Sequence, residues 1–268
     1  MNLAKCEICP HKCRIDRTKN QIGRCKSTDK VKIALYSIHD FEEPCISGKN
    51  GSGTVFFSNC NMNCIYCQNY EISQEGRGKE ISIEELADIF IKQQNRNVEN
   101  IPIVYNTNGY ERVETLKLLK GYIDIYLPDL KYYDDKIGKK YSKIDNYFEI
   151  ATKAIQEMYR QVGAPKLDER GIIKKGLMIR HLVLPNNIEN SKKVLKWIKE
   201  NIDENVYIDI MAQYFPTYKA KESLELNRKL TKEEYEEIEQ YVYELDIKNG
   251  YMQELGEHEE EYVPKWEF

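Results

Sequence analysis

The placement of the cysteines constrains this sequence more than any other feature. All eight lie within the first 67 of 268 residues. We find no apolar leader before them and no later segment apolar enough to span a membrane, so we expect a cytoplasmic protein. Thiols stay reduced there, and closely spaced cysteines then bind metal or do redox chemistry more often than they form disulfides. An exported disulfide-rich protein is the weaker alternative.

Three of the cysteines form one compact group. Cys60, Cys64 and Cys67 follow the pattern C-x3-C-x2-C in "FSNCNMNCIYCQNY", directly after the strand-like run "TVFFS". Structural zinc takes four protein ligands, and cuboidal iron–sulfur clusters prefer four thiolates. Three clustered thiolates therefore leave one iron of a cluster open to an outside ligand. Tyr66, just before the last cysteine, can shield such a cluster from water and help set its potential.

A second cysteine group lies at the N-terminus. Cys6, Cys9, Cys13 and Cys25 are spaced C-x2-C-P-H-x-C-x11-C. Four thiolates at this spacing can close a tetrahedral zinc site or hold an auxiliary iron–sulfur cluster, because the same ligands serve either metal. His11 could replace one of the thiols. Cys45 is left over, and we interpret it as a small buried hydrophobic residue rather than a ligand.

From residue 51 onward, strand-like and helix-like segments alternate, which predicts an α/β fold with parallel strands and crossover helices. We expect strands at 53–58, 101–106, 122–127, 176–185 and 206–212. Helices are expected at 82–96, 111–119, 145–161, 190–201 and 231–245. This pattern divides the chain into a Cys-rich metal-binding module (1–50), a barrel (51–230) and a C-terminal helix with an acidic tail (231–268).

Helix starts and turns have signals of their own. Ser82 with Glu85, and Thr231 with Glu234, have the spacing of capping boxes. Either Asn190 or Ser191 is expected to cap the helix at 190–201. The glycine-rich run at 48–54 lacks the Lys-Ser/Thr of a phosphate loop, so it predicts a turn. The acidic end of the chain is interpreted as a solvated or surface-docked tail rather than an active-site cover.

Polar segments follow the predicted strands, as the cysteine triplet follows the first of them. "NTNGY" (106–110), "PDLKYYDD" (128–135) and "AQYFPTY" (212–218) come after later strands. In a parallel barrel the loops at the carboxyl ends of strands share one face, where chemistry is done. We therefore expect a shared site, although Asn, Gly, Pro and Asp also end strands for purely local reasons.

These motifs together resemble the radical S-adenosylmethionine superfamily. "TVFFSNCNMNCIYCQN", "YNTNGY", "YLPDLKY" and "IRHLVLP" occur in the order found in activating enzymes of glycyl-radical proteins. The sequence is most similar to pyruvate formate-lyase-activating-enzyme-like proteins that carry an N-terminal "CxxCPHxC" segment. The resemblance spans roughly residues 6–245, and it implies a partial (β/α)6-type barrel with a small N-terminal Cys-rich module.

The resemblance also implies a mechanism. Cys60, Cys64 and Cys67 would hold a [4Fe–4S] cluster whose open iron binds S-adenosylmethionine, and reductive cleavage of this cofactor would give a 5′-deoxyadenosyl radical that abstracts hydrogen. Flavodoxin or ferredoxin would supply the electron, and a glycyl-radical protein would be one possible substrate. By position, the family's cofactor-binding loops correspond to Asn106, Asn108, Asp129 and Lys131. Lys131 could pair with the methionine carboxylate.

The sequence departs from the family pattern in three places. One βα unit is missing between the helix at 82–96 and the strand at 101–106, so the sheet must close around the gap or leave an edge. Asn106 stands where the activating enzymes have Asp, and Gln213 or Tyr214 stands where they have a later His. Arg180 and His181 lie within a strand, either as a satisfied pair in the barrel wall or as substrate contacts.

Two classes of function follow from these observations. The first is a radical S-adenosylmethionine enzyme acting on a protein or a small molecule. The second is a non-catalytic iron–sulfur or zinc scaffold or electron carrier, suggested by the missing βα unit. The formal charge of −4, with Lys and Arg spread along the chain, gives no reason to expect a nucleic acid as ligand.

Overall fold

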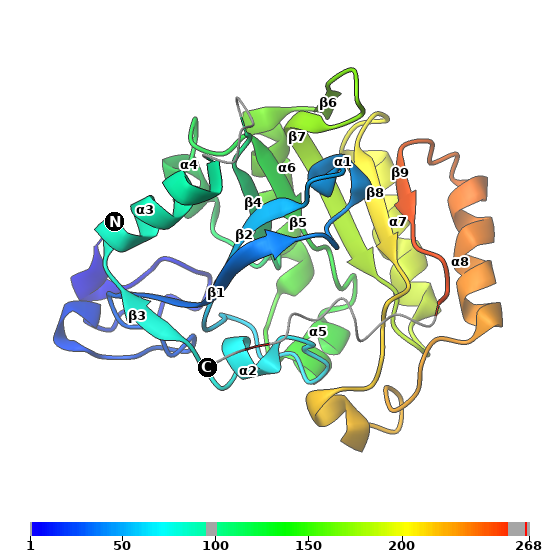
Figure 1. The fold of residues 1–268 in the computed structure, drawn as a ribbon. Helices are drawn as coiled ribbons and strands as arrows, with labels where there is room; N and C mark the ends of the chain where they lie inside the picture. Colours follow the sequence, from blue (N-terminus) through cyan, green and yellow to red (C-terminus); the bar gives the residue numbers. More distant parts are fainter. Residues whose placement is uncertain (1, 95–100, 257–265, 267–268) are drawn as a thin grey trace.

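The computed structural model of the protein describes residues 2–94, 101–256 and 266. Its main element is a parallel sheet in the order β4-β5-β7-β8-β9, with the short β6 beside β7 (Figure 1). The strands are β4 (Val104–Thr107), β5 (Ile125–Pro128), β6 (Lys166–Leu167), β7 (Ile173–Leu182), β8 (Tyr207–Met211) and β9 (Gly250–Met252). The predicted α/β class with a parallel sheet is therefore confirmed.

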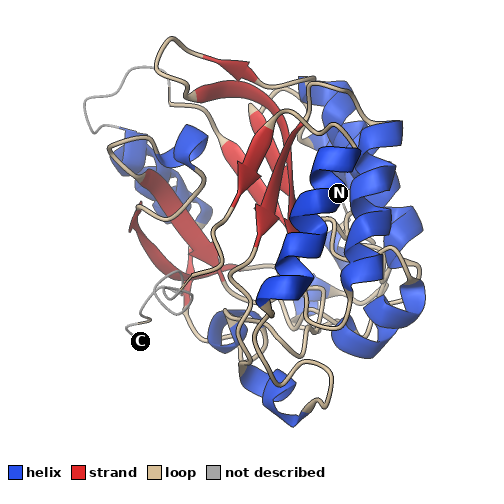
Figure 2. Cartoon of the chain, turned by 90° about the vertical axis from the view of Figure 1, so that its right-hand side faces the viewer, coloured by secondary structure: helices blue, strands red, loops and turns tan. Residues whose placement is uncertain are grey.

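Helices cover one face of the parallel sheet, and a smaller sheet lies on its other side (Figure 2). The covering helices are α4 (Val113–Leu118), α6 (Tyr147–Val162), α7 (Ile188–Asn201) and α8 (Lys232–Glu244). Leu177 and Ile179 of β7 are fully buried in one core with Ile155 and Met158 of α6. Burial of such side chains stabilises the fold by about 1.5–3 kcal/mol each. This core packs α6 against β7.

The smaller sheet contradicts one prediction. The segment at 53–58, expected as the first strand of the barrel, forms β2 (Ser52–Phe57) and pairs antiparallel with β1 (Val31–His39). β3 (Lys79–Ile81) completes the order β2-β1-β3. The physical reason is local: β1 supplies a nine-residue antiparallel partner after a short connection. Five parallel strands do occur, but β9 is one of them and β2 is not.

The predicted partial barrel is consequently not closed by strand pairing in the described residues. β4 ends the parallel sheet, with β5 as its strand partner. In the chain, β4 comes directly after α3 (Ile83–Gln94), with residues 95–100 outside the described part. The expected gap of one βα unit thus coincides with a sheet edge. The boundary expected at residue 50 stays a prediction, and β1 pairs with β2 across it.

Two of the three predicted helix starts are confirmed. Ser82 and Glu85 exchange backbone-to-side-chain hydrogen bonds at the start of α3, and α8 begins with the capping box of Thr231 and Glu234. The cap of α7 was misplaced: the N-cap is Asn187. Asn190 and Ser191 lie inside the helix, where their side chains bond Tyr133 N and His181, respectively, instead of capping it.

The remaining elements are short. They are the 3-10 turns η1 (Leu3–Lys5), η2 (Arg17–Lys19) and η3 (Tyr218–Glu222), and the helices α1 (Pro44–Ser47), α2 (Tyr70–Ser73) and α5 (Asp135–Ser142). Among the described residues, no helix has the length and apolar character that crossing a membrane requires. Most of the predicted acidic tail, residues 257–265, lies outside the described part.

Candidate functional site

The cysteine triplet occupies the loop between β2 and α2. Cys64 is buried, and Cys60 and Cys67 are half-buried. The C-terminal end of α5 forms one wall of this loop: Asn63 N donates to Ser142 O (3.0 Å) and Ile65 N to Tyr141 O (2.8 Å). The loop is thereby fixed to the carboxyl side of the parallel sheet.

Each of the three sulfurs has a polar neighbour. Asn108 Nδ2 donates to Cys60 Sγ (3.3 Å), and Ser142 Oγ donates to Cys64 Sγ (2.9 Å). Cys67 Sγ lies 3.1 Å from Ser73 Oγ. Hydrogen bonds of this kind favour the thiolate over the thiol and tune the potential of a metal bound to it.

Burial has the opposite effect on the thiols of the free protein. It raises the pKa of Cys60, Cys64 and Cys67 to about 11 each, and the positive charge of Lys131 acts against that rise at all three. One cation therefore lies close enough to influence the whole triplet. Because a bound metal ion deprotonates its thiol ligands, metal binding in this loop would release protons.

Tyr66 ends a chain of hydroxyl groups that leads to Cys64. Its hydroxyl lies 2.5 Å from that of Tyr132, which lies 2.6 Å from Ser142 Oγ. Each hydroxyl carries one proton. Since Ser142 donates to Cys64, it must accept from Tyr132, and Tyr132 must accept from Tyr66. The ring of Tyr66 is buried in the main core cluster, and its shielding role stays a prediction.

We expect Ser142→Ala to shift the midpoint potential of a cluster in this loop to a more negative value. Without the donated hydrogen bond, the more negative reduced cluster loses stabilisation relative to the oxidised one. Potentiometric titration followed by EPR measures the shift. Tyr66→Phe should change the potential in the same direction and by less, since Ser142 keeps its bond to Cys64. A potential unchanged in Ser142→Ala would contradict the assignment of this donor.

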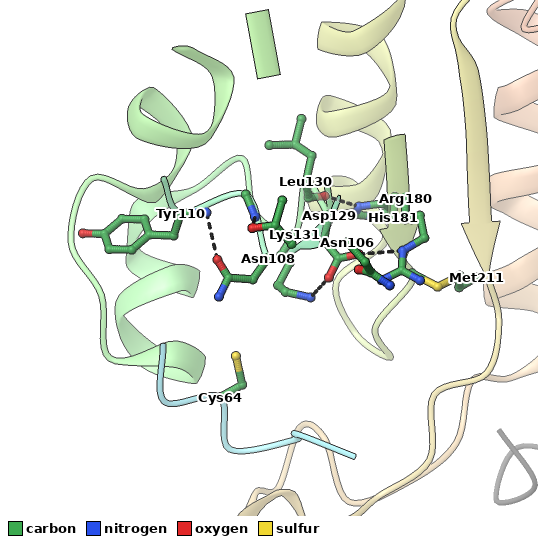
Figure 3. Close-up of polar contacts among 12 residues, drawn as sticks. Cys64, Asn106, Asn108, Tyr110, Asp129, Leu130, Lys131, Arg180, His181 and Met211 are labelled. Atoms are coloured by element: carbon green, nitrogen blue, oxygen red, sulfur yellow. Dashed lines mark hydrogen bonds and ion pairs between the residues drawn. The ribbon is translucent and has the colours of Figure 1, made fainter. Parts of the chain in front are cut away.

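A row of charged side chains crosses the sheet beside the loop. Arg180 on β7 is the register partner of Asp209 on β8, and it forms an isolated parallel bridge with Asp129, directly after β5. Asp129 Oδ2 pairs with Lys131 Nζ at 2.5 Å, and its Oδ1 accepts from Arg180 Nε at 3.0 Å. Arg180 Nη2 donates to Asn106 Oδ1 at 2.8 Å. In Figure 3 the sulfur of Cys64 points toward the side of this row that carries Lys131.

The charges of this row shift one another's pKa values. Burial would raise the pKa of Asp129, but Lys131 and Arg180 outweigh it and leave that pKa below its ordinary value. On the far side of Arg180, Glu42 and Glu43 lie 3.9 and 3.6 Å from Nη1. Burial, with help from neighbouring carboxylates, raises the pKa of Glu42 to about 7 and that of Asp209 to about 8.

We expect Asp209→Asn to flatten the pH dependence of stability. The unfolded chain loses this proton near pH 4, whereas the folded protein holds it to about pH 8. Wild-type stability therefore falls as pH rises through that window. Because neighbouring carboxyls share the effect, the difference between variant and wild type should favour the variant by about 2 kcal/mol more at pH 8 than at pH 5. Urea unfolding at both pH values measures it.

The exposed Asp88 on α3 provides the control for this comparison. Asp88→Asn also removes one carboxylate, and it should change the free energy of unfolding by less than about 0.5 kcal/mol at either pH, as substitutions of exposed side chains generally do. A wild-type stability that rises between pH 5 and pH 8 in step with Asp209→Asn would contradict the raised pKa of Asp209.

The side chains of Arg180 and His181 lie on opposite faces of the sheet. Arg180 belongs to the charged row, whereas His181 faces the helices and is fully buried. Its Nδ1 lies 2.7 Å from Leu130 O and its Nε2 2.9 Å from Ser191 Oγ. Burial lowers the pKa of His181 to about 4, so the ring is neutral at pH 7. Of the two alternatives for this pair, His181 is the satisfied wall residue.

The asparagines of the "NTNGY" loop have distinct partners. Asn108 reaches Cys60, and its Oδ1 accepts from Tyr110 N at 2.9 Å. Gly109 has a φ of 76°, and a Cβ there would lie 2.4 Å from Asp129 O. Only glycine therefore lets this loop approach Asp129 so closely. Asn106 contacts Arg180 rather than the triplet.

The two residues that follow β8 and correspond to the later His of the activating enzymes, Gln213 and Tyr214, lie outside the charged row. Tyr214 is buried, and its hydroxyl donates to Leu226 O at 2.6 Å. Gln213 accepts from Gln68 Nε2 through its backbone oxygen at 2.9 Å. Neither side chain joins the charged row. Cys45 is buried in a core cluster with Met178, which confirms its interpretation as a small hydrophobic residue.

The four N-terminal cysteines lie together, apart from the triplet. Burial raises the pKa of Cys9 to about 11, and negative charge on Cys25, Cys13 and Cys6 adds to the rise. His11 has a partner outside this group: its Nε2 donates to Asn61 O at 2.7 Å. In the described chain, no three His, Cys, Asp or Glu side chains converge closely enough to hold a single metal ion as they stand.

Comparison with known proteins identifies a relative. No family model matches the chain. The uncharacterized protein MJ0674 of Methanocaldococcus jannaschii is 33% identical over 282 aligned positions, which cover 90% of this chain and 76% of that protein. The chain belongs to the family of this archaeal protein.

Crystal structures of Streptococcus suis SuiB show a weaker likeness. The structure of SuiB bound to S-adenosylmethionine has a TM-score of 0.44 at 12% identity and matches 78% of this chain. A second SuiB structure has a TM-score of 0.43 at 13% identity and matches 76% of this chain. The chain spans about half the length of SuiB, 51% and 49% in the two alignments.

Several residues of the site could not be found by motif. The sequence allows two interpretations of Arg180, and no motif marks Glu42, Glu43, Asp209 or Ser142. Asp209 and Arg180 are register partners on neighbouring strands, so a correct strand register would have brought them together. Glu42 and Glu43 precede α1, and no periodic signal connects them with the sheet.

Proposed function

We propose that this chain is a radical S-adenosylmethionine iron–sulfur protein, in which Cys60, Cys64 and Cys67 hold a [4Fe–4S] cluster. The observation that carries the proposal is the triplet loop itself. Three thiols share one loop, each sulfur has a polar neighbour, and Lys131 acts on all three. The other cysteines are in the N-terminal module or, like Cys45, in the core.

The donor set fits a cluster. Thiolates are the ligands that iron–sulfur clusters take, and a cuboidal cluster binds each of them at a different iron. Its cysteines therefore need not converge on one point as the ligands of a single zinc ion do. The half-buried setting of the loop between α5 and the charged row also keeps the sulfurs away from bulk water.

The chain's own residues would orient the cofactors and exclude water. When bound, the cluster and S-adenosylmethionine supply reductive cleavage of a sulfonium C–S bond and a radical that abstracts hydrogen. Lys131 offers a positive charge for a carboxylate, and Asp129 fixes the direction of that lysine from one side while Arg180 holds Asp129 from the other. Asn108 holds Cys60 and the loop that carries it.

The finer assignment follows the resemblance to activating enzymes. In this proposal the hydrogen donor is a glycyl-radical protein or a small molecule, and a flavodoxin or ferredoxin is the reductant. The four N-terminal cysteines belong to a separate centre. Of the pair Arg180 and His181, Arg180 remains the candidate for a substrate contact, although it is already paired with Glu43 and Asp129.

The test is formation of 5′-deoxyadenosine. The chain is purified and reconstituted without oxygen, and S-adenosylmethionine and dithionite are added. We expect product with wild type and with Cys45→Ala, whose thiol lies in the core, and none with Cys67→Ala. Absence of product from a wild-type sample that contains four irons per triplet would overturn the proposal.

The second candidate function is a non-catalytic iron–sulfur scaffold or electron carrier. It is favoured by the sheet edge at β4, where the activating enzymes that the sequence resembles have a further βα unit. S-adenosylmethionine would then leave the EPR spectrum of the reduced cluster unchanged. A changed spectrum excludes this second candidate.

A further inference from the structure

Residues 2–30 form a module without an apolar core. In this stretch the buried side chains are those of Cys6 and Arg17, and Ile22 is exposed. A segment of this size that buries so little apolar surface needs disulfides, a metal or a partner domain to keep one conformation. Its cysteines are free thiols in the structure. The stabilising element must therefore come from the sulfurs themselves or from contacts with the rest of the chain.

Arg17 donates hydrogen bonds to two of those sulfurs. Its side chain is only 4% exposed, and its Nε donates to Cys6 Sγ at 2.9 Å while its Nη2 donates to Cys25 Sγ at 3.2 Å. The third nitrogen, Nη1, donates to Ser27 O. No carboxylate of the described residues forms an ion pair with Arg17. A buried guanidinium needs a negative partner, because an unpaired buried charge is strongly destabilising.

We infer that Cys6, Cys9, Cys13 and Cys25 bind a metal centre as four thiolates, and that Arg17 is its buried counter-ion. Four thiolates carry more negative charge than a zinc ion or an iron–sulfur cluster neutralises, so a cation that donates to two of the sulfurs stabilises either centre. The shared chemistry is a closed four-thiolate site, and forming it requires the four side chains to turn toward one centre, since no three of them converge on a single ion as they stand in the described residues. This inference does not depend on the chemistry proposed for Cys60, Cys64 and Cys67.

The same geometry assigns His11 another role. Its Nε2 donates to Asn61 O, beside Cys60, and its ring meets that of Tyr110 edge-on at 5.5 Å. It therefore lies outside the four-thiolate set, although it stands between Cys9 and Cys13 in sequence. Further bonds from the module reach neighbouring elements: Thr115 Oγ1 donates to Ile8 O (2.6 Å) and Arg24 Nη2 to Lys143 O (2.9 Å).

These contacts give the centre a function within the molecule. Lys143 directly follows Ser142, which bonds Cys64, and Asn61 directly follows Cys60. A metal that fixes Cys9 and Cys13 also fixes His11 between them, and through it the backbone at Asn61. The N-terminal centre thus holds one side of the triplet loop in position, in the way that outer-shell groups orient metal ligands.

The experiment removes the triplet and asks what remains. The full chain carrying Cys60→Ala, Cys64→Ala and Cys67→Ala is purified without oxygen, and zinc, iron and acid-labile sulfide are measured. We expect a bound centre to remain: about one zinc per chain if it is a single ion, or iron with matching sulfide if it is a cluster. Adding Cys9→Ala should remove it. A triple variant without metal, or metal that persists after Cys9→Ala, would overturn the inference.

Failure of the proposed function gives a different result in this experiment. If the triplet does not hold a cluster, wild type and the triple variant contain the same amount of iron. The metal that the triple variant retains measures the N-terminal centre alone. The result for that centre is therefore independent of whether Cys60, Cys64 and Cys67 hold a cluster.

A second comparison tests the counter-ion and excludes His11 as ligand. In the triple variant, Arg17→Met should lose its metal to EDTA at least about 10-fold faster, as loss of an outer-shell partner generally does. Arg17→Lys, which keeps the charge, should fall between the two. Arg14→Met is the control, because Arg14 is exposed and pairs with Glu7. His11→Ala should retain the metal. Equal rates for Arg14→Met and Arg17→Met, or loss of metal in His11→Ala, would contradict these roles.

Discussion

Replacing Cys64 by alanine is expected to abolish cluster binding at the triplet and lower 5′-deoxyadenosine formation by more than about 100-fold. Loss of an outer-shell partner already costs 10–100-fold in affinity or activity at metal sites, and loss of a ligand costs more. Cys64 is the most buried of the three thiols and receives the hydroxyl chain through Ser142. Iron and sulfide analysis with a product assay measures both effects.

Cys45→Ala is the matched control for this variant, since it also removes a buried thiol. It should keep the iron content of wild type, although it leaves a small cavity beside Met178. Iron bound to Cys64→Ala at the wild-type ratio, with product formation intact, would show that the triplet is not the cluster site.

Arg180→Met is expected to lower the free energy of unfolding by about 3 kcal/mol at pH 7. The substitution leaves Asp129, Glu43 and Asn106 without the guanidinium that they share. Removing one partner of a buried ion pair costs 3–5 kcal/mol. We expect a loss at the lower end of this range. Burial raises the pKa values of Glu42 and Asp209, so these carboxyls can take up a proton when the guanidinium is removed. Urea unfolding of the full chain measures the loss.

Two further variants test whether the loss of stability in Arg180→Met comes from the stranded carboxylates. Arg170→Met removes an arginine whose side chain is 69% exposed and pairs with Asp168, so it should cost less than about 1 kcal/mol. Adding Glu43→Gln to Arg180→Met should restore part of the loss, because it removes one of the stranded carboxylates. If Arg180→Met and Arg170→Met were equally stable, Arg180 would not be holding the charged row together.

The site residues that come directly after a strand could be predicted from the sequence. Asn108, Asp129 and Lys131 each come after a strand of the parallel sheet, and the structure brings all three close to the triplet or to one another. Parallel strands place their carboxyl ends at one edge, so order along the chain was enough. The assignment of Asn106, Asn108, Asp129, Lys131 and Tyr66 to cofactor binding stays a prediction.

The partner of β2 could not be predicted in the same way. Its apolar residues fit a barrel strand as well as an antiparallel hairpin. The choice depends on β1, a nine-residue strand in the segment that the sequence predicts to be a small Cys-rich module. The charged row could not be predicted from the sequence for a related reason. Arg180 and Asp209 meet only after two strands adopt one register, and Glu43 joins them from a distant segment. Local patterns do not carry such long-range pairings.

The most direct measurement is the EPR spectrum of the reduced wild-type protein, reconstituted without oxygen, before and after addition of S-adenosylmethionine. The account predicts a cluster signal that changes when the compound is added, because the iron without a cysteine ligand binds it. The same sample with S-adenosylhomocysteine, which lacks the sulfonium, should yield no 5′-deoxyadenosine. A cluster signal that is identical with and without S-adenosylmethionine, or a protein without iron, would contradict the account.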